Sequence, residues 1–155
     1  MKVKNLLISL LILISCIFTF AACGSSNAIN SVKRHNIDTK LLNDYEIVCD
    51  VKGETFTGRA PCYGVFSFKN EPTAFLQSFS TEKSDGFSSE KNEKLEEEIE
   101  NCIGGHTCME IPEEHLPDWD DHYIWFVDGK VGSLDTLYMI YFPNDLRLVV
   151  FETGH

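Results

Sequence analysis

Side chains that could bind a metal or act as nucleophiles gather in the segment CIGGHTC, which contains Cys102, His106 and Cys108. Two thiolates and an imidazole are good zinc ligands, and a thiolate beside an imidazole could also serve as a nucleophile. The spacing is not that of a usual zinc-binding clip, and a fourth ligand would have to be Glu110 or His115. No residue is evident that would orient the histidine for catalysis. The segment is therefore a weak metal-site candidate, and we assign no catalytic residue.

Carboxylates and a tryptophan crowd the segment EIPEEHLPDWDDH, residues 110–122, which contains six acidic residues and two prolines. Oxygen ligands from Asp118, Asp120 and Asp121 could bind a calcium ion, although the EF-hand pattern is absent. The alternatives are paired carboxylates for acid–base catalysis and a solvated acidic loop. Trp119 is either buried under the loop as a local core or exposed as an anchor for a partner or sugar. Trp119 and the three aspartates are therefore the candidate partner-binding residues.

Composition and missing motifs restrict the functions to be considered. The sequence contains no G-x-S-x-G, no phosphate-binding P-loop, no G-x-G-x-x-G and no H-E-x-x-H. It has 24 acidic and 13 basic residues, and its formal net charge is −11. This charge repels the phosphate backbone of nucleic acids, so we expect no nucleic-acid partner. We predict no cofactor, and binding is favoured over catalysis.

The N-terminus has the composition of a signal peptide. Lys2 and Lys4 precede an apolar run that extends from residue 6 to residue 20. This run is shorter than the roughly 20 apolar residues of a membrane span and is typical of a segment that is removed on export. We therefore assign residues 1–22 to a signal peptide and exclude them from the fold expectations.

The end of this segment, Phe20-Ala21-Ala22-Cys23, resembles the lipobox of bacterial lipoprotein precursors. The resemblance covers residues 1–26 only. It implies that Cys23 receives a diacylglyceryl group with fatty acyl chains such as palmitate, that signal peptidase II cuts before it, and that it becomes the first residue. Two acyl chains are about the minimum for stable membrane attachment, so the expected location is the extracytoplasmic face of the cell membrane. The alternative is ordinary secretory cleavage near Ala22, which leaves a plain thiol.

The rest of the chain is expected to form a short tether and one domain. Residues 23–34 contain the polar stretch GSSNAINS, and we predict a lipidated Cys23 followed by a flexible tether. Residues 35–155 are long enough for a single domain with a hydrophobic core.

Four cysteines remain after the signal peptide and the lipidation site. They are Cys49, Cys62, Cys102 and Cys108. An even number outside the cytoplasm indicates two disulfides, for which three pairings are possible. The pairing of neighbours, 49 with 62 and 102 with 108, fits the expected hairpin and helix corner. Buried thiols are the alternative.

Hydrophobic patterning predicts an α+β fold in which an antiparallel sheet, with a C-terminal meander of hairpins, packs against one principal helix. Strands are expected at 45–51 and 65–68, with Pro61 confining the second to an edge or a late start. Two C-terminal hairpins are expected. The first joins HYIWFV to KVGSL through Asp128-Gly129, and the second joins LYMIYF (137–142) to LRLVVFE (146–152) through Pro143-Asn144-Asp145.

The principal helix is expected between Ser88 and Ile103, with Ser88 or Ser89 as its N-cap and Gly104-Gly105 at its end. Its apolar stripe consists of Leu95, Ile99, Cys102 and Ile103. A short helix is predicted within residues 32–44, and TAFLQSF (73–79) could be a strand or a helix.

The sequence therefore predicts a membrane-anchored extracytoplasmic lipoprotein that acts as a binding module for an unknown protein or glycan partner. One alternative is a small extracytoplasmic hydrolase or metal-dependent enzyme. The other is a structural subunit of an envelope assembly.

Overall fold

The protein folds as an α+β domain built on one antiparallel sheet, which confirms the predicted fold class. The structure is a computed structural model that describes residues 26–55, 58–81, 84–85, 87–106 and 109–154. The predicted signal peptide, Cys23 and Cys108 lie outside these residues. Within the described part of the chain, no helix is long and apolar enough to cross a membrane.

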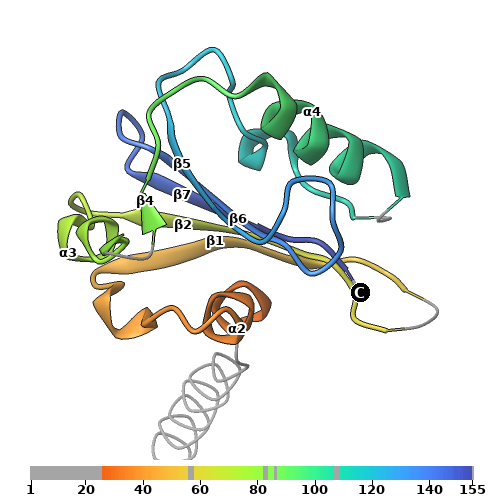
Figure 1. The fold of residues 1–155 in the computed structure, drawn as a ribbon, viewed down its shortest axis with the longest axis horizontal. Helices are drawn as coiled ribbons and strands as arrows, with labels where there is room; N and C mark the ends of the chain where they lie inside the picture. Colours follow the sequence, from red (N-terminus) through yellow and green to blue (C-terminus); the bar gives the residue numbers. More distant parts are fainter. Residues whose placement is uncertain (1–25, 56–57, 82–83, 86, 107–108, 155) are drawn as a thin grey trace, which may run out of the picture.

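Five strands form the main sheet. They are β1 (Tyr45–Lys52), β2 (Cys62–Phe68), β5 (Ile124–Asp128), β6 (Leu137–Phe142) and β7 (Arg147–Glu152). Their order is β1-β2-β7-β6-β5, and every pair of neighbours is antiparallel (Figure 1). The two short strands β3 (Ser80–Thr81) and β4 (Ser84–Asp85) pair separately.

In the described residues, three helices and three short helical turns accompany the sheet. The helices are α2 (Asn27–Arg34), α3 (Thr73–Gln77) and α4 (Glu93–Asn101). The turns are the 3-10 helices η1 (Thr39–Leu41) and η3 (Glu113–His115) and the π-helical η2 (Cys102–His106). Residues 73–79 thus begin a helix rather than a strand. Within residues 32–44, the predicted short helix corresponds to the 3-10 turn η1, which Asp38 caps, and α2 ends at Arg34.

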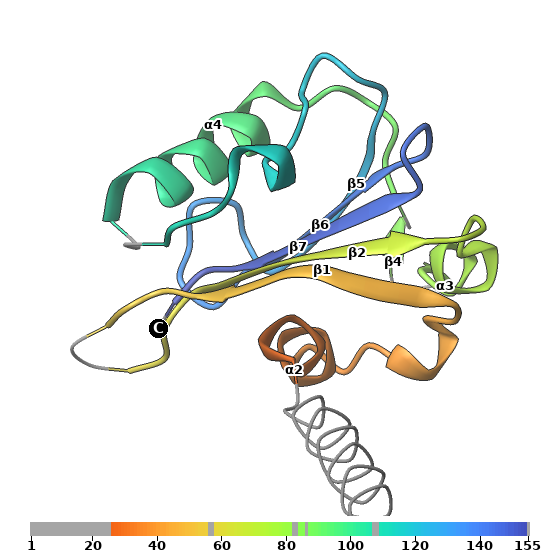
Figure 2. The same cartoon turned by 180° about the vertical axis from the view of Figure 1, so that it is seen from behind.

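The sheet is covered on both faces, by α2 on one side and by α4 on the other (Figures 1 and 2). Successive residues of β2 show this alternation, because Phe66 packs in the cluster that contains α2 and Val65 packs in the cluster that contains α4. All residues of β6 are buried. The segment LYMIYF is therefore an interior strand of the sheet, and α4 covers one of its faces.

Helix α4 carries the predicted apolar stripe but begins later than predicted. Leu95 and Ile99 are fully buried against the sheet, and Cys102 and Ile103 are half-buried beside them. Asn92 is the N-cap, and its side chain accepts a hydrogen bond from the Leu95 N–H. The predicted N-caps at 88 and 89 are wrong because Ser88 instead forms an isolated bridge with Trp125 of the edge strand β5.

The two C-terminal hairpins differ in outcome. The hairpin of β6 and β7 across residues 143–146 is confirmed, since Phe142 pairs with Arg147. The two-residue turn at Asp128-Gly129 is wrong: Asp128 pairs with Leu137, so a longer loop joins β5 directly to β6. Gly129 still adopts a φ of +121°, as expected of a glycine in a turn. KVGSL lies in this loop rather than in a strand.

The local disulfide between Cys49 and Cys62 is not formed, because the two side chains lie on opposite faces of the sheet. Cys49 packs in the core on the α4 side, whereas Cys62 contacts Ser31 of α2. The register places Val65, not Cys62, opposite Cys49. A disulfide needs Cβ atoms that face each other, which this arrangement forbids. The pairing of Cys102 with Cys108 stays a prediction because Cys108 lies outside the described residues.

The predicted flexible tether is wrong from residue 26 onward, where the chain forms helix α2. Ser26 caps the helix by accepting the Ile29 N–H, and Ala28 and Val32 are fully buried against the sheet. The helix approaches β2 closely at Gly64, where an added Cβ would lie 2.3 Å from the Cβ of Ala28. A glycine at position 64 is therefore what allows α2 to lie flat on this face.

We expect the substitution Gly64→Ala to lower the free energy of unfolding by about 1–3 kcal/mol, because the added methyl group overpacks the contact with Ala28. The double variant Gly64→Ala/Ala28→Gly should recover part of this loss. Urea denaturation monitored by tryptophan fluorescence measures both. Gly104→Ala is the matched control, since a Cβ there meets no atom within 4 Å. If the effects of Gly64→Ala and Ala28→Gly simply added in the double variant, the proposed contact would be contradicted.

Candidate functional site

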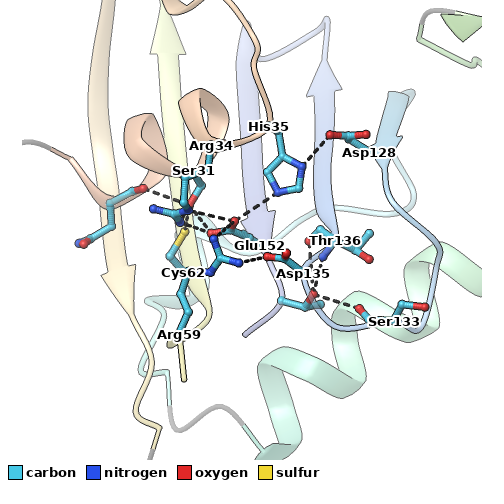
Figure 3. A network of polar contacts seen from close by, with 12 residues as sticks. Ser31, Arg34, His35, Arg59, Cys62, Asp128, Ser133, Asp135, Thr136 and Glu152 are labelled. Atoms are coloured by element: carbon cyan, nitrogen blue, oxygen red, sulfur yellow. Dashed lines mark hydrogen bonds and ion pairs between the residues drawn. The ribbon is translucent and has the colours of Figure 1, made fainter. Parts of the chain in front are cut away.

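A buried carboxylate at the end of the sheet organises a cluster of polar and charged side chains. Glu152 is the last residue of β7, and its side chain is 0% exposed on the face that α2 covers. Its Oε2 accepts a hydrogen bond from the Ser31 hydroxyl at 2.8 Å and an ion pair from Arg34. Its Oε1 accepts from Arg34 Nε and from His35 Nε2, each at 3.2 Å (Figure 3). The last turn of α2 thus surrounds one buried negative charge.

Three further charged side chains extend this cluster to the loop between β5 and β6. His35 Nδ1 lies 2.7 Å from Asp128 Oδ2, at the end of β5. Arg59 Nη1 lies 3.7 Å from Glu152 Oε1, and the same guanidinium pairs with Asp135 (Figure 3). The cluster therefore ties α2, the segment before β2, the β5–β6 loop and the end of β7 together.

The charges in this cluster stabilise one another. Burial alone would raise the pKa of Glu152, but hydrogen bonds from His35, Arg34 and Ser31 lower that pKa to about 2. The hydrogen bond to Glu152 raises the pKa of His35 against the opposing effect of burial, and Asp128 adds to the rise. Glu152 is therefore ionised, and His35 holds its proton more tightly than an ordinary histidine.

The geometry of this cluster favours a structural role over catalysis. Ser31 is fully buried, and its Oγ contacts Glu152 and Cys62 rather than a histidine. Burial raises the pKa of the Cys62 thiol to about 11, which leaves it protonated and a poor nucleophile at neutral pH. Potential metal ligands of His35, Asp135 and Glu152 lie within 4.8 Å of one another. However, the guanidinium of Arg59 pairs with both of these carboxylates and would have to leave before a cation could bind.

The predicted partner-binding residues lie on the other face of the molecule, in the loop beside α4. Trp119 is half-buried and packs edge-on against Tyr123, with a distance of 5.5 Å between ring centroids. Its ring also contacts Phe142 of β6, at 6.4 Å. The local-core interpretation of Trp119 is therefore correct for one side of the ring. Whether the rest of the ring can also bind a partner depends on the surface pockets that it lines.

Hydrogen bonds from the sheet hold this acidic loop in place. The Tyr63 hydroxyl donates to the carbonyl of His115 at 2.6 Å, and Arg147 Nη1 donates to the carbonyl of Glu114 at 3.1 Å. Asn144 Nδ2 in the β6–β7 turn donates to Asp121 Oδ1 at 2.6 Å. A loop tied to the sheet at several points is preorganised, which reduces the entropy lost on binding.

Trp119 separates two neighbouring surface pockets. The first is polar and contains Trp119, Asp120 and Asp121, whereas Asp118 does not line it. The remaining lining residues of this pocket are Ser89, Lys91, His122 and Tyr123. The second pocket is largely apolar, and it lies between the end of α4 and the loop. Its lining residues are Ile99, Glu100, Ile103, Gly104, Leu116, Pro117 and Trp119.

The aspartates of the loop do not gather as calcium ligands. Asp118 Oδ1 accepts a hydrogen bond from the Asp120 N–H at 3.1 Å, and Asp121 is held by Asn144. Among the described residues, only His35, Asp135 and Glu152 bring three potential ligands together. The structure thus joins Trp119, Asp120 and Asp121 around one pocket but gives no support to a calcium site. The zinc candidates cannot be placed, because Cys108 and the His106 side chain lie outside the described part.

Negative charge is concentrated around this face. Residues 88–122, which include α4 and the acidic loop, contain 12 of the 24 acidic residues and two of the 13 basic residues. Residues 26–44, which include α2 and η1, contain two acidic and three basic residues. The α4 side is therefore strongly acidic, and the α2 side is close to neutral.

Sequence reasoning missed the cluster around Glu152. Its members are far apart in the sequence, and no spacing pattern joins Arg34 to Glu152. The one available signal was an acidic residue at the end of the apolar strand LRLVVFE, which would need a partner if it were buried.

No protein-family model, curated protein sequence or solved structure matches this chain. The function is therefore inferred from the residues and their geometry.

We expect the substitution Glu152→Gln to lower the free energy of unfolding by about 2–4 kcal/mol, because Arg34 and His35 would face a neutral amide in a buried site. Urea denaturation at pH 6 measures the change. Glu46→Gln is the matched control: Glu46 is an exposed residue of the edge strand β1, and its replacement should change the free energy by less than about 0.5 kcal/mol. Equal effects of the two substitutions would show that the cluster does not stabilise the fold.

The pKa shifts also predict how stability depends on pH. The raised pKa of His35 adds stability that is complete below its ordinary value of 6.5 and is lost as the pH rises through the raised value. The lowered pKa of Glu152 adds stability that is present above 4.5 and is lost as the pH falls toward 2. The difference in the free energy of unfolding between wild type and His35→Gln should therefore be largest between pH 4.5 and pH 6.5. It should shrink as the pH rises through the raised pKa of His35. A difference that grew as the pH rose above 6.5 would contradict this assignment.

Proposed function

We propose that the protein is an extracytoplasmic lipoprotein, anchored to the cell membrane through Cys23, that binds a positively charged protein segment on the face formed by α4 and the acidic loop. The proposed anchor rests on the lipobox resemblance of residues 20–23. The observation that carries the proposed binding activity is the position of Trp119, which lines both a polar pocket that contains Asp120 and Asp121 and an apolar pocket.

The chemistry of these two pockets suits a lysine or arginine next to an apolar side chain. Asp120 and Asp121 line the polar pocket and can attract a cation, while Leu116 and Pro117 line the apolar pocket. Half-buried tryptophans that offer an apolar surface at the centre of a rigid patch are common binding hot spots. The acidic surroundings would speed association with a cationic partner and would exclude anionic ones.

Binding is favoured over the enzymatic alternative on geometric grounds. In the described residues, no hydrogen bond joins the side chain of Asp120 or His122 to another titratable side chain. The buried Ser31 and the protonated Cys62 lie on the opposite face. A nucleophile with an adjacent base, as hydrolysis by covalent catalysis requires, is therefore not assembled in this pocket.

Panning of the immobilised protein against a random peptide library tests the binding proposal. We expect enrichment of peptides with lysine or arginine beside an aromatic or aliphatic residue. Trp119→Ala should weaken an enriched peptide by about tenfold or more, as is typical of a hot-spot tryptophan. Asp120→Asn/Asp121→Asn should also weaken binding and reduce its salt dependence.

Controls separate a lost surface from a lost fold. Trp119→Phe keeps an aromatic ring in the core beside Tyr123. It therefore shows whether Trp119→Ala weakens binding through a lost binding surface or through a disturbed fold. Glu46→Gln/Glu71→Gln removes the same number of exposed carboxylates outside the acidic face and should leave binding unchanged. Enrichment without basic residues, or equal loss in the two charge variants, would refute the cationic partner. Selective binding to a glycan array, measured in parallel, would indicate that the partner is a sugar rather than a cationic protein segment.

A further inference from the structure

Helix α2 is held on the domain at both of its ends. At its N-terminus, the Asp50 carboxylate of β1 accepts the backbone N–H groups of Asn27 and Ala28, at 3.0 and 3.1 Å. A carboxylate at this position also interacts favourably with the helix dipole. At its C-terminus, Arg34 and His35 pair with the buried Glu152. The helix is therefore part of the rigid body of the domain from its first residue.

This attachment leaves little free chain between the domain and the predicted anchor. The four residue steps from Cys23 to Asn27 can span at most about 14 Å, even when fully extended. A diacylglyceryl group places the cysteine at the level of the lipid headgroups. The N-terminus of α2 would then lie beside the membrane surface, with no spacer long enough to let the domain turn freely.

The distribution of charge selects the face that can lie against the membrane. The α4 side carries most of the excess negative charge, and anionic lipid headgroups repel it within a Debye length of about 10 Å. The α2 side exposes Lys33 and Lys40 and is close to neutral in total charge. It exposes no large apolar side chain within α2 or η1, so it can rest on the headgroups without entering the bilayer.

We propose that the α2 side of the sheet is the membrane-facing surface of the protein and that the short tether holds it against the anionic headgroups of the bilayer. Helix α4, the acidic loop and Trp119 then point away from the membrane, because α2 and α4 cover opposite faces of the sheet (Figures 1 and 2). This inference rests on the proposed lipid anchor at Cys23.

Lysine acetylation of the full-length, membrane-processed protein tests this orientation, because native lysines mark both sides. Lys33 and Lys40 report on the α2 side, and Lys91 and Lys94 report on the α4 side. The protein is reconstituted in phosphatidylcholine vesicles that contain one quarter phosphatidylglycerol and is treated with a membrane-impermeant acetylating reagent. Mass spectrometry then gives the rate at each lysine.

The reference is a variant with a long Gly-Ser insertion between Ser25 and Ser26, which keeps the anchor but frees the domain. Relative to this variant, we expect acetylation of Lys33 and Lys40 in the wild type to fall several-fold, while Lys91 and Lys94 stay unchanged. Equal rates at all four lysines in the two proteins, or slower acetylation of Lys91 and Lys94, would overturn the orientation.

Flotation of the same vesicles separates failure of the orientation from failure of the anchor. Wild type should float with the vesicles, and Cys23→Ser should not. Flotation with equal acetylation rates would overturn the orientation alone and would leave the anchor in place. A wild type that stayed behind, or a Cys23→Ser variant that floated equally well, would overturn the lipid anchor and the orientation with it.

Discussion

A carboxylate enclosed in protein is stable only if cations and hydrogen-bond donors replace the water that it has lost. Glu152 has this requirement at the end of the central strand β7, and the last turn of α2 meets it with Ser31, Arg34 and His35. Moving α2 away would remove these three partners of Glu152 and leave the longer contact with Arg59, at 3.7 Å. This carboxylate therefore favours the position of α2 against the sheet, on the face opposite α4.

Close packing between α2 and the sheet works together with this ion cluster. Gly64 allows Ala28 to approach the backbone of β2, and the Asp50 carboxylate holds the other end of the helix. Each contact alone is local, but together they fix a helix of only eight residues that would not be stable in isolation. The sheet thereby becomes the middle layer of a molecule with two chemically different sides.

The difference between these two sides is what suggests a function. The α2 side is close to neutral in total charge, whereas the α4 side collects carboxylates around a tryptophan that packs against the sheet. A lipid attached just before α2 would present the acidic side outward, where it can meet a cationic partner. The anchor, the orientation and the binding surface thus form one consistent proposal.

The sequence alone determined the features that depend on neighbouring residues. The strands of the main sheet, the hairpin of β6 and β7, and the stripe of Leu95 and Ile99 follow from short-range periodicity and turn residues, although KVGSL was wrongly predicted as a strand. Trp119, Asp120 and Asp121 line one pocket because they are adjacent in the chain, whereas Asp118, predicted with them, does not line it; their role in binding a partner stays a prediction.

Only the tertiary structure decided the features that depend on distant residues. The Glu152 cluster combines residues from both ends of the chain, and the assignment of Cys49 and Cys62 to opposite faces depends on the strand register. Residues 23–34 were predicted to contain a flexible tether because the stretch GSSNAINS is polar. The small buried residues of α2 are stabilised by a particular glycine and a particular carboxylate far away in the sequence, and local patterns carry no information about such partners.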